Sequence, residues 1–208
     1  MVARQLGLLE PAHSGFDASF TGIKRTTLDF GAWLDYAQGW LGDHNALFEA
    51  LVRDTAWQNT EQHLYDRTVA TPRLVATFGD GQLPALVAAM QQALNTRYNH
   101  NFQRVSLALY RDGRDSVAFH GDRIARELPD ALVATVSIGA PRRFVLRPHP
   151  DMHAPESRRT LTYNLGWGDL LVMGGSCQRT WQHAIPKLRE AQPRIAIMFR
   201  PMWEPHAL

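Results

Sequence analysis

The sequence predicts an α+β, mainly β protein: a β-sandwich or double-sheet jelly roll with two helices flanking one sheet. Three observations predict this fold. Short apolar segments recur after residue 100 with Gly, Asp and Pro between them, and two segments before residue 100 have helical spacing. The chain has 208 residues, of which 45% are hydrophobic, enough for one sizeable core. A barrel of this kind has a mouth, where a ligand site is expected.

The two expected helices precede the β-rich part. Residues 44–57 follow a candidate N-cap at Asp43 and place Leu47 and Leu51 one turn apart. Residues 83–98 carry one apolar stripe, formed by Leu83, Leu86, Val87, Met90 and Leu94. Such a stripe indicates packing surface rather than a cofactor site. The first forty residues are expected to be strand-rich and peripheral.

Eight short strands are expected after residue 100, each bounded by turn residues. They are the segments VSLALY, SVAFHGD, ALVATVSIG, RRFVLRP, RTLTYNL, DLLVMGG, RTWQHAI and PRIAIMFRP. No repeat, low-complexity stretch or linker divides the chain, so a single domain spanning residues 1–208 is expected.

The composition indicates the cellular compartment more clearly than it indicates the binding partner. The single cysteine, Cys177, excludes an internal disulfide, so a reducing cytoplasm is expected. No apolar stretch is long enough for a signal peptide or a membrane span, and we expect a monomer away from membranes. The net charge is only +2, but all basic residues except Lys24 and Lys187 are arginine, which suits contacts to phosphate or carboxylate.

A histidine and an aspartate interrupt the apolar segment SVAFHGD. Residues i and i+2 of a strand share a face, so His120 and Asp122 are expected to project side by side. His183, on a late strand of the same barrel, is the best-placed third ligand. His149 and His153 are competitors, although the surrounding prolines and charges favour a loop for both. Two imidazoles and one carboxylate would form the facial triad of a non-haem Fe(II) oxygenase.

The last strand carries two arginines with period-two spacing. In PRIAIMFRP, Arg194 and Arg200 share one face and bulky hydrophobic residues occupy the other. If that apolar face is the barrel core, the arginines are merely exposed. If the arginine face lines the barrel mouth, two guanidinium groups converge on an anion such as a small dicarboxylate.

Several segments together resemble one family, the AlkB-type Fe(II)/2-oxoglutarate dioxygenases of alkylated nucleic-acid repair. The resemblance spans about residues 65–201 and includes LYRDGRDSVAFHGD, TVSIGAPRRFVLRP, GDLLVMGGSCQRTWQHAIPK and PRIAIMFRP. It implies a double-stranded β-helix (jelly-roll) core over residues 100–203. It also implies a nucleotide-recognition lid over 57–82, with residues 1–56 as an N-terminal extension and helix.

The resemblance also implies roles for individual residues. His120, Asp122 and His183 match the iron ligands, and Arg194 matches the arginine that binds the distal carboxylate of 2-oxoglutarate. The remaining assignments are Arg200, Tyr110 and Thr135 in the co-substrate pocket and Tyr65, Ile124 and Arg73 toward the substrate. The implied cofactor is Fe(II), and the implied co-substrates are 2-oxoglutarate and O2.

Three positions depart from the family pattern. Ala108 and Ala196 stand where asparagines usually contribute to the co-substrate pocket, which predicts weaker binding by about 1–3 kcal/mol for two neutral hydrogen bonds. Ile124 stands where relatives often carry an acidic residue that reads a methylated base. An isoleucine packs against a ring but accepts no hydrogen bond.

The resemblance implies oxidative demethylation of N-alkylated bases, with DNA or RNA as the partner and formaldehyde and succinate as products. Ile124 and the small net charge leave open the same chemistry on RNA, protein or a small metabolite. The two absent asparagines leave open a non-catalytic metal-binding or nucleic-acid-binding module.

Overall fold

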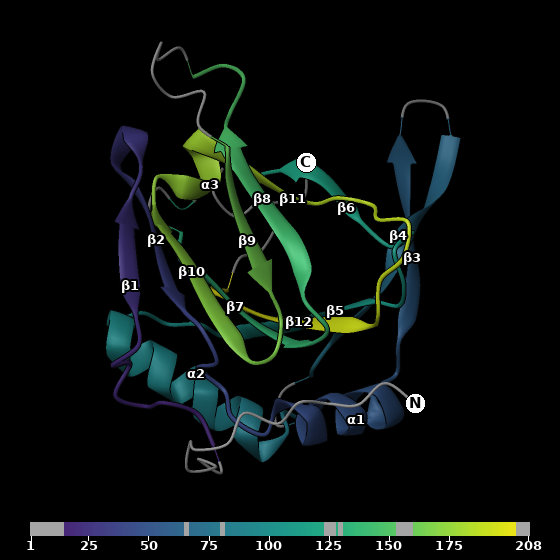
Figure 1. Ribbon diagram of the computed structural model, residues 1–208, viewed down its shortest axis with the longest axis horizontal. Helices are drawn as coiled ribbons and strands as arrows, with labels where there is room; N and C mark the ends of the chain where they lie inside the picture. The colour runs from purple at the N-terminus through teal and green to yellow at the C-terminus, as the bar shows by residue number, and fades with distance from the viewer. Residues whose placement is uncertain are drawn as a thin grey trace.

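The computed structural model of the chain describes residues 15–64, 67–79, 82–122, 128, 131–152 and 160–202. Two antiparallel sheets face each other, and helices α1 and α2 lie along the outer side of the larger sheet (Figure 1). The elements in chain order are β1 (Lys24–Thr27), η1 (Asp29–Gly31), β2 (Ala32–Ala37), α1 (His44–Asp54), β3 (Gln58–Leu64), β4 (Arg67–Thr77), α2 (Ala85–Tyr98), β5 (Arg104–Tyr110), β6 (Val117–His120), β7 (Val133–Gly139), β8 (Arg142–Pro148), β9 (Leu161–Leu165), β10 (Asp169–Gly175), α3 (Cys177–Thr180), β11 (Trp181–Ile185) and β12 (Arg194–Arg200).

The two sheets divide the strands unequally. The larger sheet has the order β1-β2-β10-β7-β12-β5-β4-β3, and the smaller has the order β6-β11-β8-β9. The eight segments expected to be strands after residue 100 correspond to β5 through β12. The expectation of a mainly β fold with two facing sheets and two helices against one of them is therefore confirmed, and the fold is a jelly roll.

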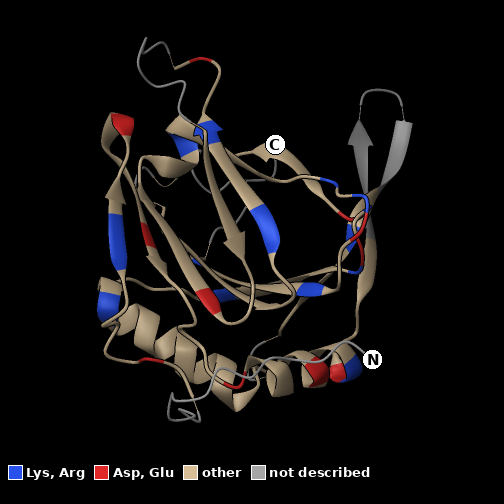
Figure 2. Cartoon of the chain, viewed as in Figure 1, with Lys and Arg blue, Asp and Glu red and all other residues tan. Residues whose placement is uncertain are grey.

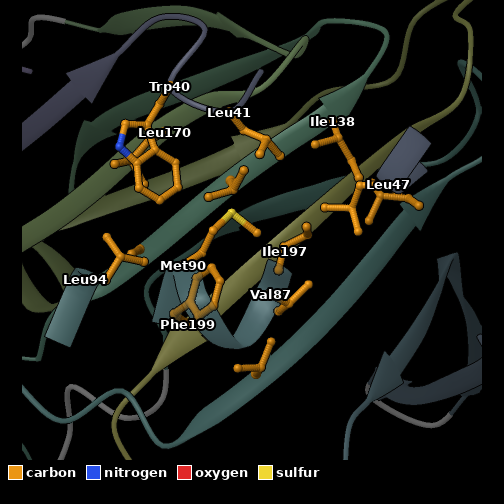
Figure 3. Close-up of a cluster of buried hydrophobic side chains, with 14 of the residues drawn as sticks. Trp40, Leu41, Leu47, Val87, Met90, Leu94, Ile138, Leu170, Ile197 and Phe199 are labelled. Atoms are coloured by element: carbon orange, nitrogen blue, oxygen red, sulfur yellow. The ribbon is translucent and has the colours of Figure 1, made fainter. Parts of the chain in front are cut away.

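The main hydrophobic core lies between the larger sheet and the two long helices (Figure 3). The expected stripe of α2 forms one side of it, because Val87, Met90 and Leu94 are fully buried. Ile197 and Phe199 face them from β12. These alternate residues of a strand share one face, which leaves the other face of β12 free to point between the sheets.

A second apolar cluster fills the space between the sheets. It includes Ala108 and Tyr110 from β5, Ala196 from β12, and Phe144 and Leu146 from the smaller sheet. The larger sheet is therefore buried on both faces over its central strands, which accounts for the near-continuous burial of β7 and β10.

The helix boundaries differ slightly from those expected. Helix α1 ends at Asp54, and Asp43 occupies the N-cap position without a side-chain capping bond because its backbone is left-handed, with φ of 35°. Helix α2 begins after Pro84 and ends at Tyr98, and its C-cap is Asn99, whose left-handed backbone suits an asparagine. Of the helices described, none has the length and apolar character needed to cross a membrane.

Of the first forty residues, the described part from residue 15 onward is less peripheral than expected. Strand β1 is an edge strand, but β2 lies inside the larger sheet between β1 and β10. Leu34 of β2 is completely buried between the sheets. The expectation fails here because β2 is short and mixes polar with apolar residues, so nothing in it signals pairing with β10, more than 130 residues later.

Candidate active site

His120, Asp122 and His183 meet at one point between the sheets. Each offers one ligand atom, and these atoms all lie within 4.8 Å of one another. The two histidines are directly opposite each other in the antiparallel pairing of β6 with β11, and their ring centroids are 4.3 Å apart. Two imidazoles and one carboxylate on one side of a shared point are the donor set that suits Fe(II) in non-haem oxygenases.

The aspartate reaches this point by a different route from the one expected. Strand β6 ends at His120, so Asp122 projects from the following loop and not from the same strand face. The Asp122 backbone N–H donates to Gln178 Oε1 at 3.0 Å instead of pairing with a strand. Between the two ligands, Gly121 passes so close to α3 that an added Cβ would lie 2.2 Å from the Gln178 carbonyl oxygen.

Hydrogen bonding and burial prepare both imidazoles as ligands. His120 Nδ1 donates to the Ala118 carbonyl oxygen at 2.8 Å, which leaves the lone pair of Nε2 free to bind a metal. His183 lies against the ring of Phe144, with centroids 5.3 Å apart. Burial, together with nearby His120, lowers the pKa of His183 to about 3, so this imidazole is neutral at physiological pH.

Arg200 supports the carboxylate of the cluster. Arg200 Nε donates to Asp122 Oδ2 at 2.7 Å, and Arg200 Nη1 donates to Ser106 Oγ at 2.8 Å. Burial raises the pKa of Asp122, but the guanidinium of Arg200 and the two imidazoles outweigh it and hold this pKa well below its usual range. The carboxylate is therefore ionised and oriented, with Oδ1 directed toward His120 Nε2 at 3.8 Å.

Arg194 lies at the other end of β12 and is almost completely enclosed. It is 1% exposed, its Nη2 donates to Ser137 Oγ at 2.5 Å, and Tyr110 is a further hydrogen-bond partner. Its Nε is buried without a partner among the described residues. Burial lowers the pKa of Arg194 to about 10, which still leaves it a cation at neutral pH. A buried cation with an unused donor fits an anion, so the residues present fit a carboxylate-bearing co-substrate.

One cavity of about 290 Å³ connects these groups. Its walls include the three candidate ligands, both arginines of β12, and the expected pocket residues Tyr110, Thr135 and Arg73. Tyr110 is directly opposite Arg194 in the pairing of β5 with β12, and Thr135 is opposite Met198 in the pairing of β7 with β12. The arginine face of β12 therefore points into the cavity and not into solvent, which decides between the two alternatives that the spacing allows.

Of the three residues expected to contact the substrate, the structure describes one. Arg73 lines the cavity and donates from Nη1 to the Ser116 carbonyl oxygen at 3.2 Å. Tyr65 and Ile124 lie outside the described residues, as does His153. His149 lies just after β8, is not part of the ligand cluster, and interacts with Asp151.

Three polar residues that support the site were not expected from the sequence. Ser137 binds Arg194, Ser106 binds Arg200, and Gln178 binds the backbone of Asp122. Ser106 could have been found, because it lies two positions from Ala108 and four from Tyr110 on the same face of β5. Ser137 and Gln178 have no sequence signal, since each depends on a pairing between distant segments.

Comparison with known proteins agrees with this geometry. The model of the 2OG-Fe(II) oxygenase superfamily matches residues 44–200. Alpha-ketoglutarate-dependent dioxygenase alkB homolog 3 of Bos taurus is 31% identical over 205 residues, covering 88% of this chain and 68% of the relative. DNA oxidative demethylase ALKBH2 of Mus musculus is 27% identical, covering 79% of this chain and 81% of the relative.

Solved structures share the fold at lower identity. A prolyl hydroxylase of Trichoplax adhaerens, in complex with a hypoxia inducible factor peptide fragment, has a TM-score of 0.58 at 12% identity, with 80% of this chain and 82% of that chain covered. The structure of OsALKBH1 has a TM-score of 0.55 at 14% identity, with 86% of this chain and all of that chain covered.

Proposed function

The chain belongs to the 2OG-Fe(II) oxygenase superfamily, and we propose that it removes N-linked methyl groups from nucleic-acid bases, with DNA as the substrate. As a member of this family, and as a relative of the alkB homologs, it is an AlkB-type Fe(II)- and 2-oxoglutarate-dependent dioxygenase that uses O2. The observation that carries the proposal is the meeting of His120, Asp122 and His183 in one cavity with Arg194.

The three clustered side chains would hold the iron. His120 is tautomerically fixed with Nε2 free, His183 is neutral, and the Asp122 carboxylate is ionised and oriented by Arg200. When bound, Fe(II) supplies the reaction of O2 with 2-oxoglutarate that yields succinate and CO2 and places one oxygen atom in a substrate C–H bond. On an N-methyl group, the hydroxymethyl product releases formaldehyde.

The deep end of the cavity would hold 2-oxoglutarate. Arg194 is buried with an unused Nε, and a distal carboxylate would give this donor an acceptor. Tyr110, opposite Arg194 and 4% exposed, and Thr135 would complete this pocket. With Ala108 and Ala196 also facing the space between the sheets, the charge-assisted bonds of the arginines carry most of the binding.

Access to the cavity and the name of a relative both support a nucleobase as the substrate. The candidate iron ligands line a cavity, so a base meets them only after it leaves its stack, and a base methylated on its pairing edge is more easily extruded because it pairs poorly. The name of one relative, DNA oxidative demethylase ALKBH2, supports the same substrate class. Arg73 at the cavity wall is proposed to contact the substrate.

The test is formaldehyde release from oligonucleotides that each carry one N-methylated base, as single-stranded DNA, duplex DNA and RNA. We expect formaldehyde in proportion to succinate with at least one DNA, none with unmethylated controls, and none with Asp122→Ala. Succinate formation without formaldehyde from any oligonucleotide would instead place the same chemistry on a protein or a small metabolite.

A further inference from the structure

The walls of the cavity carry more positive charge than the co-substrate and the metal site use. They include Arg73, Arg104, Arg194 and Arg200, while Asp122 is the one carboxylate that the described residues place in these walls. Arg73, Arg194 and Arg200 are each hydrogen-bonded within the protein. In the part of the chain that the structure describes, the Arg104 side chain has no hydrogen-bond or ion-pair partner. With respect to the described residues, this arginine is therefore an unpaired cation at the cavity wall.

Arg104 lies at the rim, next to the metal cluster. It is the first residue of β5, it is exposed, and the alternate residues of the same strand, Ser106, Ala108 and Tyr110, line the cavity below it. In the pairing of β5 with β12, Arg104 is directly opposite Arg200. Residues opposite each other in an antiparallel pair have Cβ atoms about 4.5–5.5 Å apart.

This placement is unfavourable for an arginine without an anion. Like charges directly opposite each other destabilise a strand pair. The Asp122 carboxylate neutralises Arg200, but it would neutralise Arg200 less well once it also binds Fe(II). The distal carboxylate of 2-oxoglutarate does not supply this anion, because Arg194, which would bind it, lies at the opposite end of β12 from Arg104. That strand has seven residues, or roughly 20 Å at 3.4 Å per residue.

We infer that Arg104 binds a backbone phosphate of the substrate strand, next to the base that enters the cavity. The inference rests on the proposed function and adds a residue that determines how the strand is held. A guanidinium offers paired donors that match two phosphate oxygens, and a rim position keeps it within reach of a backbone that stays outside the cavity. Arg104 would thus set the depth and register of the extruded nucleotide relative to the cluster.

The experiment combines a protein change with a substrate change. Formaldehyde release is measured for the wild type and for Arg104→Gln on a methylated DNA oligonucleotide, and again with each flanking phosphate replaced singly by a neutral methylphosphonate. We expect Arg104→Gln to lower kcat/KM about tenfold, and one methylphosphonate to lower the wild type about as much. That methylphosphonate should add little to the loss in Arg104→Gln. The slope of log kcat/KM against log salt should fall in magnitude by about one.

Arg143 provides the matched control. It is an exposed arginine of β8, a strand whose basic residues are marked in Figure 2, and it does not line the cavity. Arg143→Gln removes the same charge from the chain, and we expect wild-type kcat/KM from it.

Three results would overturn the inference: wild-type kcat/KM in Arg104→Gln, an equal loss in Arg143→Gln, or equal methylphosphonate losses with and without Arg104. A wild-type chain that releases no formaldehyde from any oligonucleotide would overturn the proposed function itself. That result is distinct, because the first three all require a wild type that is active on DNA.

Discussion

Arg200 Nε lies 2.7 Å from Asp122 Oδ2, so the last strand of the fold holds a carboxylate that comes from the loop after β6, 78 residues earlier in the chain. The Asp122 side chain is 10% exposed and the Arg200 side chain 20%, so water screens this pair only weakly. The contact fixes one oxygen of the carboxylate and leaves the other directed at His120.

Arg200→Gln should therefore weaken metal binding without removing a ligand. Partners that orient a ligating group typically contribute tenfold to hundredfold to metal affinity, and we expect a loss in that range. The measurement is the affinity for Mn(II), titrated by paramagnetic resonance. Arg179→Gln, at an exposed arginine of α3, is the control. Unaltered Mn(II) affinity in Arg200→Gln would show that Asp122 is held by other groups.

Gly121→Ala should disrupt the same cluster through the backbone. The added Cβ would lie 2.2 Å from the Gln178 carbonyl oxygen, and real Cβ contacts stay above 3.0 Å, so the backbone must move. We expect a destabilisation of about 1–3 kcal/mol and a clear loss of Mn(II) affinity. Gly22→Ala is the control, because nothing lies within 4 Å of its Cβ. Equal unfolding midpoints and equal metal affinities in the two variants would contradict the close packing of Gly121 on α3.

Arg194→Ala should act on the co-substrate. A hydrogen bond to a charged group contributes about 1.5–3 kcal/mol, so the KM for 2-oxoglutarate should rise between about tenfold and hundredfold. Ser137→Ala removes one neutral partner of Arg194 and leaves its charge, and it should raise this KM by a smaller factor. Initial rates of succinate formation at varied 2-oxoglutarate give both values. A KM that is the same in Arg194→Ala and wild type would remove this arginine from the pocket.

Cys177 should make the fold sensitive to alkali. Burial raises the pKa of this thiol from 9.0 to about 12, so the unfolded chain loses the proton first. The contribution of the buried, protonated thiol to the free energy of unfolding is complete below pH 9. It is lost as the pH rises toward 12, by up to about 1.4 kcal/mol per pH unit. Urea unfolding of wild type and Cys177→Ala between pH 8 and pH 10.5 measures it. A wild type that loses no more stability than the variant over this range would contradict the burial of the thiol.

Much of the fold follows from local patterns in the sequence. The stripe of α2 and the alternation in β12 are local signals, and both elements form where they predict. The alternation also placed Arg194 and Arg200 on one face. Which face points into the cavity depends on the helices that cover Ile195, Ile197 and Phe199, and strand spacing does not contain that information.

The supporting groups of the site could not be predicted for the same reason. Gln178 reaches Asp122 only because α3 packs beside the loop after β6, and Ser137 reaches Arg194 only because β7 pairs with β12. The prediction that Asp122 projects from the same strand as His120 was wrong. The strand ends at His120, where the close approach of Gly121 to α3 replaces strand pairing. These are long-range contacts, which a local pattern does not determine.

The most direct measurement is an anaerobic titration of Fe(II) into the wild type and His183→Ala, with bound metal per chain as the result. The clustering of His120, Asp122 and His183 within 4.8 Å predicts one Fe(II) per wild-type chain and a loss of affinity of more than about a hundredfold in His183→Ala, more than an orienting partner contributes. A folded His183→Ala chain that binds one Fe(II) as tightly as the wild type would contradict the metal centre.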